Sequence, residues 1–442
     1  MLQTSHRVLR ACVLLLSAFL LSSCAGHPQP GESQAAGDGA TTRAGAAHTG
    51  EYPNLFVEAG YPRDVVDARI EAAFAQLFHG DPDSEAVYYE AGGNEHGPLA
   101  YIHDVNSDDV RSEGMSYGMM IAVQMDRKRE FDAIWNWALT HMYHDDPGHP
   151  AYGYFAWSVR TDGTAIDEMP APDGEEYFIT ALYFASARWG DGEGRYDYRA
   201  HADRLLHHVL HREPVTGPTN RGTMTAVNLF DRDARMVRFT PDVENAGHTD
   251  ASYHLPAFYE VWARVGPEAD RAFWREAAAA SRDYFARAAH PRTGLTPDYG
   301  NFDGTPWAAP WRPEAADFRY DAWRTAMNWS MDWSWWRADP RQVELSNRLQ
   351  AFFLDQGLDD HQSLYSLDGQ PLGGGRTTAL VAMNATASLA ADHPRRLDFV
   401  RALWDLPVPT GQYRYYDGML QMMALLHLSG RYRIWWPPGT AP

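Results

Sequence analysis

Apolar side chains recur at helical spacing along most of the chain, and this periodicity most restricts the possible fold. Met115, Met119, Ala122 and Val123 lie at i, i+4, i+7 and i+8, which places them on one face of a helix. Similar stripes, bounded by Gly, Pro or Asp, predict about twelve helices. They lie near residues 64–79, 112–125, 127–142, 174–189, 200–212, 249–265, 268–288, 321–337, 340–356, 376–391, 394–404 and 413–429.

Alternating strand and helix patterns of the βαβ kind are missing, so we expect an all-α fold. Short extended pieces such as residues 236–242 are expected to pair locally in the loops. About twelve helices in one chain of this size favour a closed α/α arrangement. Linker-like composition does not reappear after residue 50, which predicts one domain over residues 51–442.

The amino end resembles a secretory signal. Arg7 and Arg10 precede an apolar stretch over residues 13–21, which is too short for a membrane-spanning helix. Cys24 follows Leu-Ser-Ser and resembles the cleavage site of a bacterial lipoprotein. We therefore expect a signal peptide over residues 1–23, acylation of Cys24 and an exported, membrane-anchored protein facing the periplasm or the cell surface. An ordinary signal peptide with a chance cysteine is the alternative.

Residues 25–50 contain no large apolar side chain and many Gly, Ala and Pro residues. Such a segment cannot bury enough apolar surface to fold, so residues 24–50 are expected to form a lipidated, flexible tether. The other cysteine, Cys12, lies inside the predicted signal peptide. The mature protein is therefore expected to fold without an internal disulfide.

The formal net charge of −20 at pH 7 argues against nucleic acid as a partner and suits a neutral substrate. The single lysine, Lys128, does not lie in a P-loop sequence, and it makes Schiff-base chemistry improbable. We expect a monomer.

Residues 114–118 spell Gly-x-Ser-x-Gly, the nucleophile elbow of serine hydrolases, with Ser116 at its centre. That motif needs an apolar strand before the turn, whereas residues 104–109 are polar. A helix whose glycines let a neighbour approach closely fits the sequence better. A serine esterase using Ser116 is the weaker alternative.

Three acids, Glu113, Asp173 and Asp321, each open a predicted helix. They could simply be caps, since Ser112 suits an N-cap and Asp173 with Glu176 fits a capping box. In an α/α ring, however, helix ends gather at one mouth, which would bring the three acids together. A general acid among them would need burial or a second carboxylate to raise its pKa.

Aromatic residues crowd the same parts of the chain. Rings beside loop-borne acids suit a sugar, whose C–H face packs on them while its hydroxyls bond to carboxylates. Many must instead belong to the core. The residues concerned are Trp157, Tyr177, Tyr253, Trp323, Trp329, Trp333, Trp335 and Trp336.

His207 and His211 form an i, i+4 pair on a predicted helix, as metal ligands do. No acid accompanies them at the spacing of a zinc protease, so a solvated helix face is favoured. We expect no metal site and no organic cofactor.

Six blocks together resemble glycoside hydrolase family 8, in particular its reducing-end xylose-releasing exo-oligoxylanases. They keep their order over residues 55–436. The blocks are SEGMSYGMM (112–120), PDGEEYFITAL (172–182), TDASYHLPAFYEVW (249–262), YDAWRTAMNW (320–329), LVAMNATASLA (380–390) and YYDGML (415–420). The resemblance implies an (α/α)6 barrel and an inverting hydrolase acting on β-1,4-linked xylo-oligosaccharides.

The same resemblance implies roles for individual residues. Glu113 takes the proton-donor position, Asp321 that of the general base, and Asp173 that of the acid holding the distorted sugar at the cleavage point. Tyr253 occupies the position of a tyrosine that supports this acid. Trp157 and Arg324 are implied as substrate contacts.

The mode of cleavage is left open. In exo-acting members a loop blocks the cleft beyond the leaving sugar, and the corresponding region here is residues 368–378. Its Gly373–Gly375 run offers no side chains for a wall, although Arg376 could bind the reducing-end hydroxyl. The alternatives are an endo-acting xylanase, a glucanase or chitosanase of the same fold, and a non-catalytic, lipid-anchored glycan-binding protein.

Overall fold

A computed structural model describes residues 44–440. The predicted signal peptide, Cys24 and most of the predicted tether lie outside the described residues.

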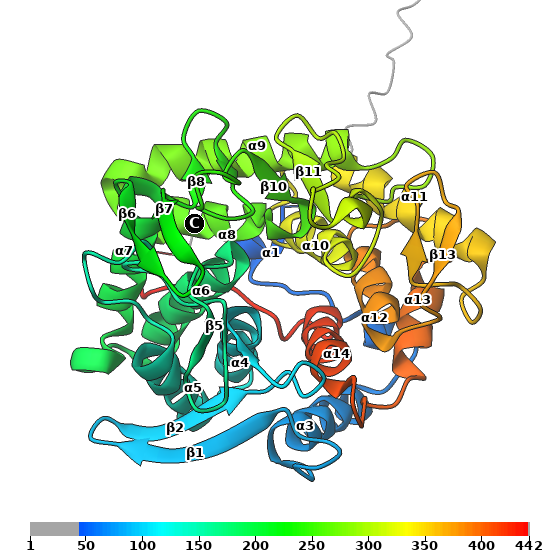
Figure 1. The fold of residues 1–442 in the computed structure, drawn as a ribbon. Coiled ribbons are helices and arrows are strands. Elements are labelled where there is room, and N and C mark those ends of the chain that lie inside the picture. The colour runs from blue at the N-terminus through cyan, green and yellow to red at the C-terminus, as the bar shows by residue number, and fades with distance from the viewer. Residues whose placement is uncertain (1–43, 441–442) are drawn as a thin grey trace, which may run out of the picture. The chain divides into compact units, whose positions relative to one another are not determined.

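Six inner helices form a closed ring, each contacting the next, with the last contacting the first (Figure 1). They are α4 (Ser112–Gln124), α6 (Pro172–Trp189), α8 (Pro256–Val265), α10 (Thr325–Trp336), α12 (Thr378–Thr386) and α14 (Arg414–Leu428).

Six outer helices each pack on one inner helix, in the same order around the ring. They are α5 (Lys128–His141), α7 (Tyr198–His211), α9 (Arg271–Ala288), α11 (Arg341–Gln356), α13 (Arg396–Trp404) and α3 (Arg63–His79). This arrangement is the expected (α/α)6 barrel, and the twelve predicted helices are confirmed.

The two rings differ in sequence because they differ in burial. In α4 every residue except Glu113 is buried, and in α10 every residue except Ser334 is buried. Helices that are apolar on all sides belong in a core, whereas α9 and the other outer helices keep a polar face for solvent. Glu113 is therefore exceptional on its helix, because it is the one residue of α4 that keeps some solvent exposure.

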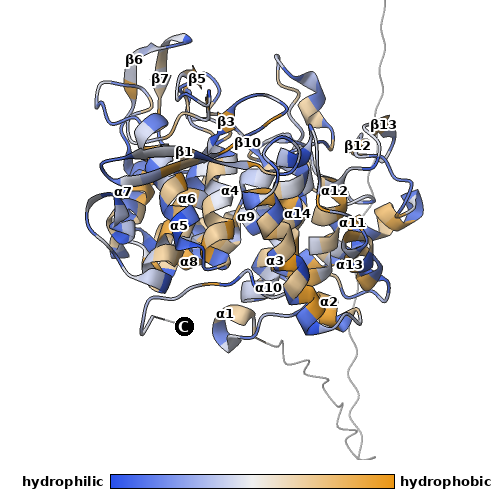
Figure 2. Ribbon diagram, turned by 90° about the horizontal axis from the view of Figure 1, so that it is seen from below, coloured by the Kyte–Doolittle hydropathy of each residue, from blue (hydrophilic) through white to orange (hydrophobic). Residues whose placement is uncertain are grey.

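Short strands and turns fill the connections, and most strands gather at one end of the barrel (Figure 2). The pairs are β1 (Tyr88–Asn94) with β2 (Gly97–Ile102), β6 (Val215–Thr219) with β7 (Gly222–Ala226), β8 (Phe230–Asp231) with β9 (Met236–Val237), β10 (His248–Asp250) with β11 (Tyr299–Asn301), and β12 (Leu364–Tyr365) with β13 (Pro371–Gly373). A three-stranded sheet joins β3 (Val110–Arg111), β4 (Ser158–Val159) and β5 (Ala165–Asp167). The expected local pairing near residue 236 is confirmed by β8 and β9.

Single 3-10 turns complete the structure. They are η1 (Gly194–Tyr196), η2 (Ala251–Tyr253), η3 (Glu268–Asp270), η4 (Pro313–Ala316), η5 (Ala322–Arg324) and η6 (Ala387–Leu389).

The helix predicted over residues 249–265 starts later than expected, at Pro256. The Asp250 side chain accepts a hydrogen bond from the Ser252 amide, which holds the preceding residues in a turn after β10. Proline suits the first turn of a helix, so Pro256 fixes the new start. The apolar periodicity alone did not show where the helix begins.

The packed domain begins before residue 51, the predicted boundary. Residues Ala46–Thr49 form the short helix α1, which packs on α10, and Ala46 and Ala47 are buried. Gly45 lies so close to the Trp335 backbone that a Cβ atom would clash. The small residues at this point, which are predicted to belong to the tether, instead allow α1 to pack closely on α10. A second short helix, α2 (Leu55–Glu58), was also not predicted.

None of the helices within residues 44–440 combines the length and the apolar character that a membrane span requires.

Candidate active site

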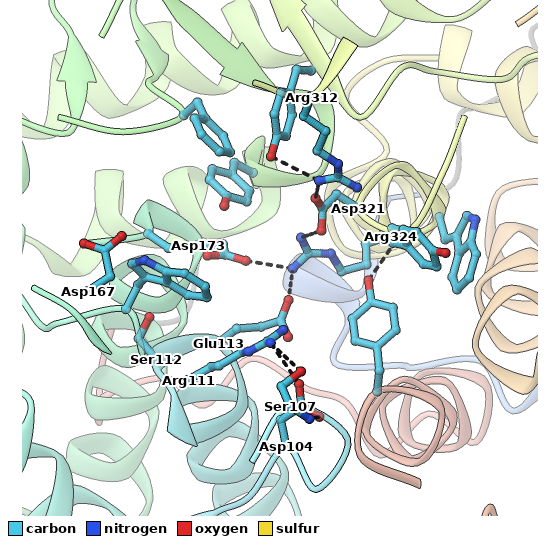
Figure 3. A pocket seen from close by; sticks show the side chains of 18 of the residues that line it. Asp104, Ser107, Arg111, Ser112, Glu113, Asp167, Asp173, Arg312, Asp321 and Arg324 are labelled. Atoms are coloured by element: carbon cyan, nitrogen blue, oxygen red, sulfur yellow. Dashed lines mark hydrogen bonds and ion pairs between the residues drawn. The ribbon is translucent and has the colours of Figure 1, made fainter. Parts of the chain in front are cut away.

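A cavity of about 1250 Å³ opens at the end of the barrel where the strands gather, and it is lined by all three predicted acids. The amino ends of the inner helices border it. Glu113 comes from α4, Asp173 from α6, and Asp321 from the residue before η5, which leads into α10 (Figure 3). The expectation that helix ends bring the acids together at one mouth is confirmed.

Arg324 joins the three acids. Its Nη1 atom lies 2.8 Å from Glu113 Oε2 and 2.7 Å from Asp173 Oδ2, and its Nη2 atom lies 3.1 Å from Asp321 Oδ1. The side chain is 2% exposed, and Nη1 also contacts the Tyr117 hydroxyl at 2.7 Å. Besides lining the cavity, Arg324 therefore fixes the acids relative to one another, a role that the sequence did not reveal.

Glu113 is poised to hold a proton. Burial raises its pKa to about 7, the nearby Arg324 guanidinium opposes this shift, and the negative charges of Asp173 and Asp321 add to it. The carboxyl oxygen of Glu113 that does not contact Arg324, Oε1, accepts a hydrogen bond of 3.1 Å from the Tyr415 hydroxyl. A carboxyl group whose pKa lies near neutral pH can still carry its proton there, which suits a general acid.

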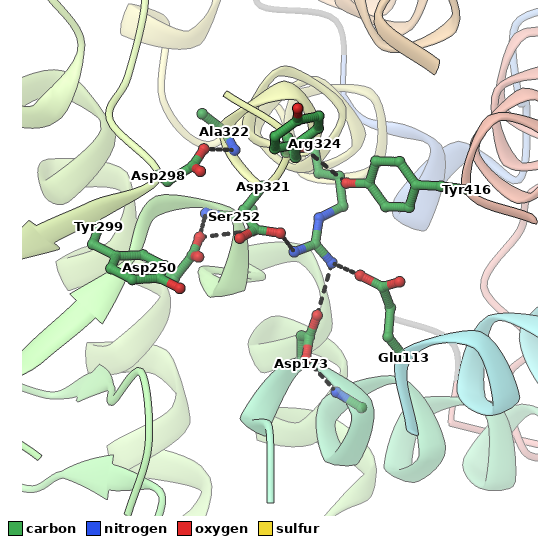
Figure 4. Close-up of polar contacts among 12 residues, drawn as sticks. Glu113, Asp173, Asp250, Ser252, Asp298, Tyr299, Asp321, Ala322, Arg324 and Tyr416 are labelled. Atoms are coloured by element: carbon green, nitrogen blue, oxygen red, sulfur yellow. Dashed lines mark hydrogen bonds and ion pairs between the residues drawn. The ribbon is translucent and has the colours of Figure 1, made fainter. Parts of the chain in front are cut away.

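Asp321 lies on the other side of the Arg324 guanidinium from Glu113 (Figure 4). A second guanidinium, that of Arg312, lies 3.6 Å from its Oδ2 atom. The side chain is 24% exposed, so it can meet a water molecule in the cavity. A carboxylate between two cations, open to water, suits a general base.

Asp173 is almost completely buried, with Oδ2 on Arg324 and Oδ1 accepting the Gly174 amide at 2.9 Å. Burial raises its pKa, and Arg324 acts in the opposite direction. The predicted capping box is wrong, because α6 begins at Pro172 without a side-chain cap. Glu176 points inward instead and accepts the Tyr259 hydroxyl at 2.5 Å.

The other predicted contacts, Tyr253, Trp157 and Arg376, all line the cavity. The Tyr253 ring lies 5.9 Å from the Arg324 guanidinium, and the Trp157 ring lies 5.6 Å from that of Arg111. Arg376 is held at the rim, where its Nε atom donates to the Leu358 carbonyl at 2.9 Å.

The aromatic residues divide between cavity and core. Trp157, Tyr253 and Trp323 line the cavity, whereas the other five predicted aromatics are buried and do not line it. Sequence reasoning missed Phe239, Tyr299, Trp311, Tyr320, Tyr413, Tyr415 and Tyr416, which line it as well. Of these, Tyr320, Tyr415 and Tyr416 could have been found, since they stand in blocks of the family resemblance.

The structure removes Ser116 as a nucleophile. It lies within α4, is completely buried, and donates its hydroxyl to the Glu113 carbonyl at 3.0 Å. Ser112 is the first residue of α4, and its buried hydroxyl has no hydrogen-bond partner, so it does not act as a cap.

His207 and His211 stack on each other, and His211 pairs with Asp270 at 2.7 Å. Within residues 44–440, no group of three or more His, Cys, Asp or Glu residues is placed to hold a metal ion.

Comparison with known proteins agrees with this geometry. The model of the family "Glycosyl hydrolases family 8" matches residues 101–430. The reducing-end xylose-releasing exo-oligoxylanase Rex8A of Paenibacillus barcinonensis is 45% identical over 89% of this chain and 99% of its own length. A corresponding enzyme of Halalkalibacterium halodurans is 43% identical over 90% of this chain and 98% of its own.

Among solved structures, a xylobiose complex of a family 8 protein from Teredinibacter turnerae is 65% identical, with a TM-score of 0.88. The alignment covers 89% of this chain and all of that one. A catalytic mutant of a family 8 xylanase from the same organism, complexed with xylohexaose, matches to the same extent. The fold, the three acids at one mouth and the match over most of the chain lead to one conclusion: this chain belongs to glycosyl hydrolase family 8.

Proposed function

We propose that this protein is an inverting glycosidase that releases xylose from the reducing end of β-1,4-linked xylo-oligosaccharides. The observation that carries the chemistry is the placement of Glu113 and Asp321 on either side of the Arg324 guanidinium, both open to one cavity. Inversion needs a carboxylic acid and a carboxylate roughly 6.5–9.5 Å apart, so that water fits on the far face of the sugar. A guanidinium between the two groups keeps them from touching.

In the reaction, Glu113 gives its proton to the glycosidic oxygen as the C–O bond breaks. Asp321 takes a proton from the water that attacks the anomeric carbon on the opposite face. Asp173 accepts a sugar hydroxyl and holds the ring at the cleavage point. Each turnover leaves Glu113 ionised and Asp321 protonated, and both reset by proton exchange through the open cavity.

The exo mode of action is supported by the curated relatives of 42–45% identity, which are named for it. Arg376 lines the cavity, and its guanidinium is able to donate hydrogen bonds to a reducing-end hydroxyl. The aromatic lining suits the flat faces of a pentose chain.

A second mode, endo-cleavage of longer chains, is favoured by one feature of the rim. Gly373, Gly374 and Gly375 all have positive φ, and Gly374 lines the cavity without a side chain that could close it. The 65% identical Teredinibacter turnerae xylanase was crystallised with six xylose units, which also suits a long cleft.

Product analysis on a ladder of xylo-oligosaccharides tests both modes. An exo enzyme of this type releases xylose from xylotriose and fails when the reducing end has been chemically reduced. Equal cleavage of reduced and unreduced substrates would establish the endo mode instead. Proton NMR during the reaction should show the α-anomer first, as inversion of a β-linkage requires; initial β-anomer would refute the mechanism.

We also propose that the protein is an exported lipoprotein held to a membrane through Cys24, and that it acts as a monomer. The Leu-Ser-Ser-Cys sequence after a short apolar stretch supports the anchor. Cells expressing the Cys24→Ala variant should release the enzyme from the membrane fraction, and radiolabelled palmitate should mark only the unmodified sequence. Light scattering measures the molar mass of a protein that starts at residue 44, and we expect the mass of a single chain.

A further inference from the structure

Arg312 approaches the candidate general base from a loop that none of the predicted site residues occupies. Its Nη2 atom donates to Asp298 Oδ2 at 3.0 Å, its Nη1 atom to the Tyr299 hydroxyl at 3.1 Å, and Nη1 lies 3.6 Å from Asp321 Oδ2. Figure 3 shows Arg312 and Arg324 on opposite sides of Asp321. The two oxygens of the base therefore face two different arginines.

Asp298 anchors this arrangement through two hydrogen bonds. It is completely buried, and its Oδ1 atom accepts the backbone amide of Ala322, the residue after Asp321, at 3.0 Å. Figure 4 shows the contact between Asp298 and the Ala322 amide. The same carboxyl group also accepts a hydrogen bond from the Arg312 guanidinium, so it holds both the backbone beside the base and the cation beside its side chain. Burial and the nearby charge of Asp321 raise the pKa of Asp298, and Arg312 opposes this shift.

Arg312 brings a second guanidinium to a part of the site that is crowded with acids. Arg324 is shared among three acids, and two further buried acids, Asp250 and Asp298, act on the same site. The charged and titratable groups facing Asp321 are Glu113, Asp173, Asp250, Tyr253, Asp298, Tyr299, Arg312, Arg324 and Tyr416.

We propose that Arg312 is a positioning residue for the general base: it orients the Asp321 carboxylate and places a second positive charge beside it. The proposal rests on the proposed function, in which Asp321 deprotonates the attacking water. Asp298 and Tyr299 hold the Arg312 guanidinium in place. Arg324 is less suited to orient Asp321 by itself, because it also contacts Glu113 and Asp173.

The test compares Arg312→Gln and Arg312→Lys with wild-type enzyme on xylo-oligosaccharides. Loss of the charge should lower kcat about 100-fold, the cost of a slightly misplaced reacting group, with little change in KM. It should also move the acidic limb of the pH profile of kcat/KM to higher pH, because Asp321 then ionises less readily. Lysine should leave that limb near its wild-type position, yet lower kcat, since a point charge cannot bridge Asp298 and Tyr299.

The matched control is Arg319→Gln. Arg319 lies near Asp321 in sequence and pairs with Asp317 at 3.9 Å, but it does not line the cavity. This variant should keep the wild-type kcat and pH profile, and thermal unfolding of all variants checks that each is folded.

A titration that needs no substrate separates this proposal from the proposed function. Carbon-13 NMR of aspartate carboxyls, with the Asp321 signal assigned by its loss in Asp321→Asn, should show a higher pKa for Asp321 in Arg312→Gln. An unchanged Asp321 titration, or a wild-type kcat in that variant, would overturn the proposal. Failure of wild-type enzyme to cleave any xylo-oligosaccharide would instead refute the function and leave the titration as the test of Arg312.

Discussion

The Tyr415 hydroxyl lies 2.6 Å from the position that a Cβ atom would occupy at Gly114, and it donates a hydrogen bond to Glu113 Oε1. A glycine after the candidate acid is thus what lets a tyrosine from α14 reach that acid. The close approach expected of the glycines in α4 is confirmed, and at Gly114 it serves the site as well as packing.

Gly114→Ala should displace Tyr415 and lower kcat about 10- to 100-fold, less than the full contribution of about 10²–10⁴-fold from a general acid, because Glu113 itself remains. If the effect passes through Tyr415, then Tyr415→Phe should give a similar loss, and the double variant should lose little more than either single one. Steady-state kinetics on xylotriose measures all three.

Gly118→Ala is the control for this cycle. A Cβ atom there would meet the Ile102 side chain at 2.7 Å, away from the cavity. Overpacking of a core costs roughly 1–3 kcal/mol of stability, so this variant should melt earlier and keep its kcat. A fully additive double variant of Gly114 and Tyr415 would contradict the coupling.

Glu113→Gln and Asp321→Asn should each reduce turnover at least about 1000-fold, since proton transfer by one group contributes about 10²–10⁴-fold. Both changes conserve size, so isothermal titration should still detect oligosaccharide binding. A near-wild-type rate in either variant would refute the assigned role, whereas loss of binding with folding intact would point to a glycan-binding site only.

The raised pKa of Glu113 predicts how activity depends on pH. Its carboxyl group must be protonated to act, and burial raises that pKa to about 7. The pH profile of kcat/KM reports groups of the free enzyme, so activity should fall as pH rises through about 7. Glu113→Gln, assayed on a substrate with an activated leaving group that needs no acid, should lack this basic limb. If the basic limb persists in Glu113→Gln, it must arise from the titration of another residue.

Sequence patterns predicted the helices and the three acids, because helical periodicity follows from burial and because acids at helix starts converge in a ring. They could not predict Arg312 and Asp298, which lie in irregular segments with no periodicity. Contacts such as that between Asp298 and the Ala322 amide depend on how distant loops fold back together. Nor could they place Ala46 and Ala47, whose small side chains look alike in a tether and in a tight contact.

Glu176 shows the same limit in a different form. Its spacing from Asp173 matched a capping box, but α6 begins at Pro172, and Glu176 lies in the core, where it accepts a hydrogen bond from the Tyr259 hydroxyl. The local sequence fitted a capping box, but the position of Glu176 in the fold was decided by tertiary packing.

Glu175 gives a prediction about stability rather than activity. It is completely buried, Oε1 accepts the Phe155 amide at 3.0 Å, and Oε2 has no hydrogen-bond partner. Burial raises its pKa from 4.5 to about 8, so the folded state holds the proton that the unfolded state releases. Its contribution to stability is therefore complete below pH 4.5 and is lost as pH rises through about 8.

Glu175→Gln keeps the acceptor for Phe155 and removes the titration. At pH 5 the two proteins should unfold at similar temperatures, whereas at pH 9 the variant should be more stable by a few kcal/mol, since one pKa unit corresponds to about 1.36 kcal/mol. Thermal unfolding between pH 5 and 9 measures the difference, with Glu244→Gln, an exposed acid, as the control. A stability difference that does not grow with pH would show that Glu175 is not protonated in the folded protein.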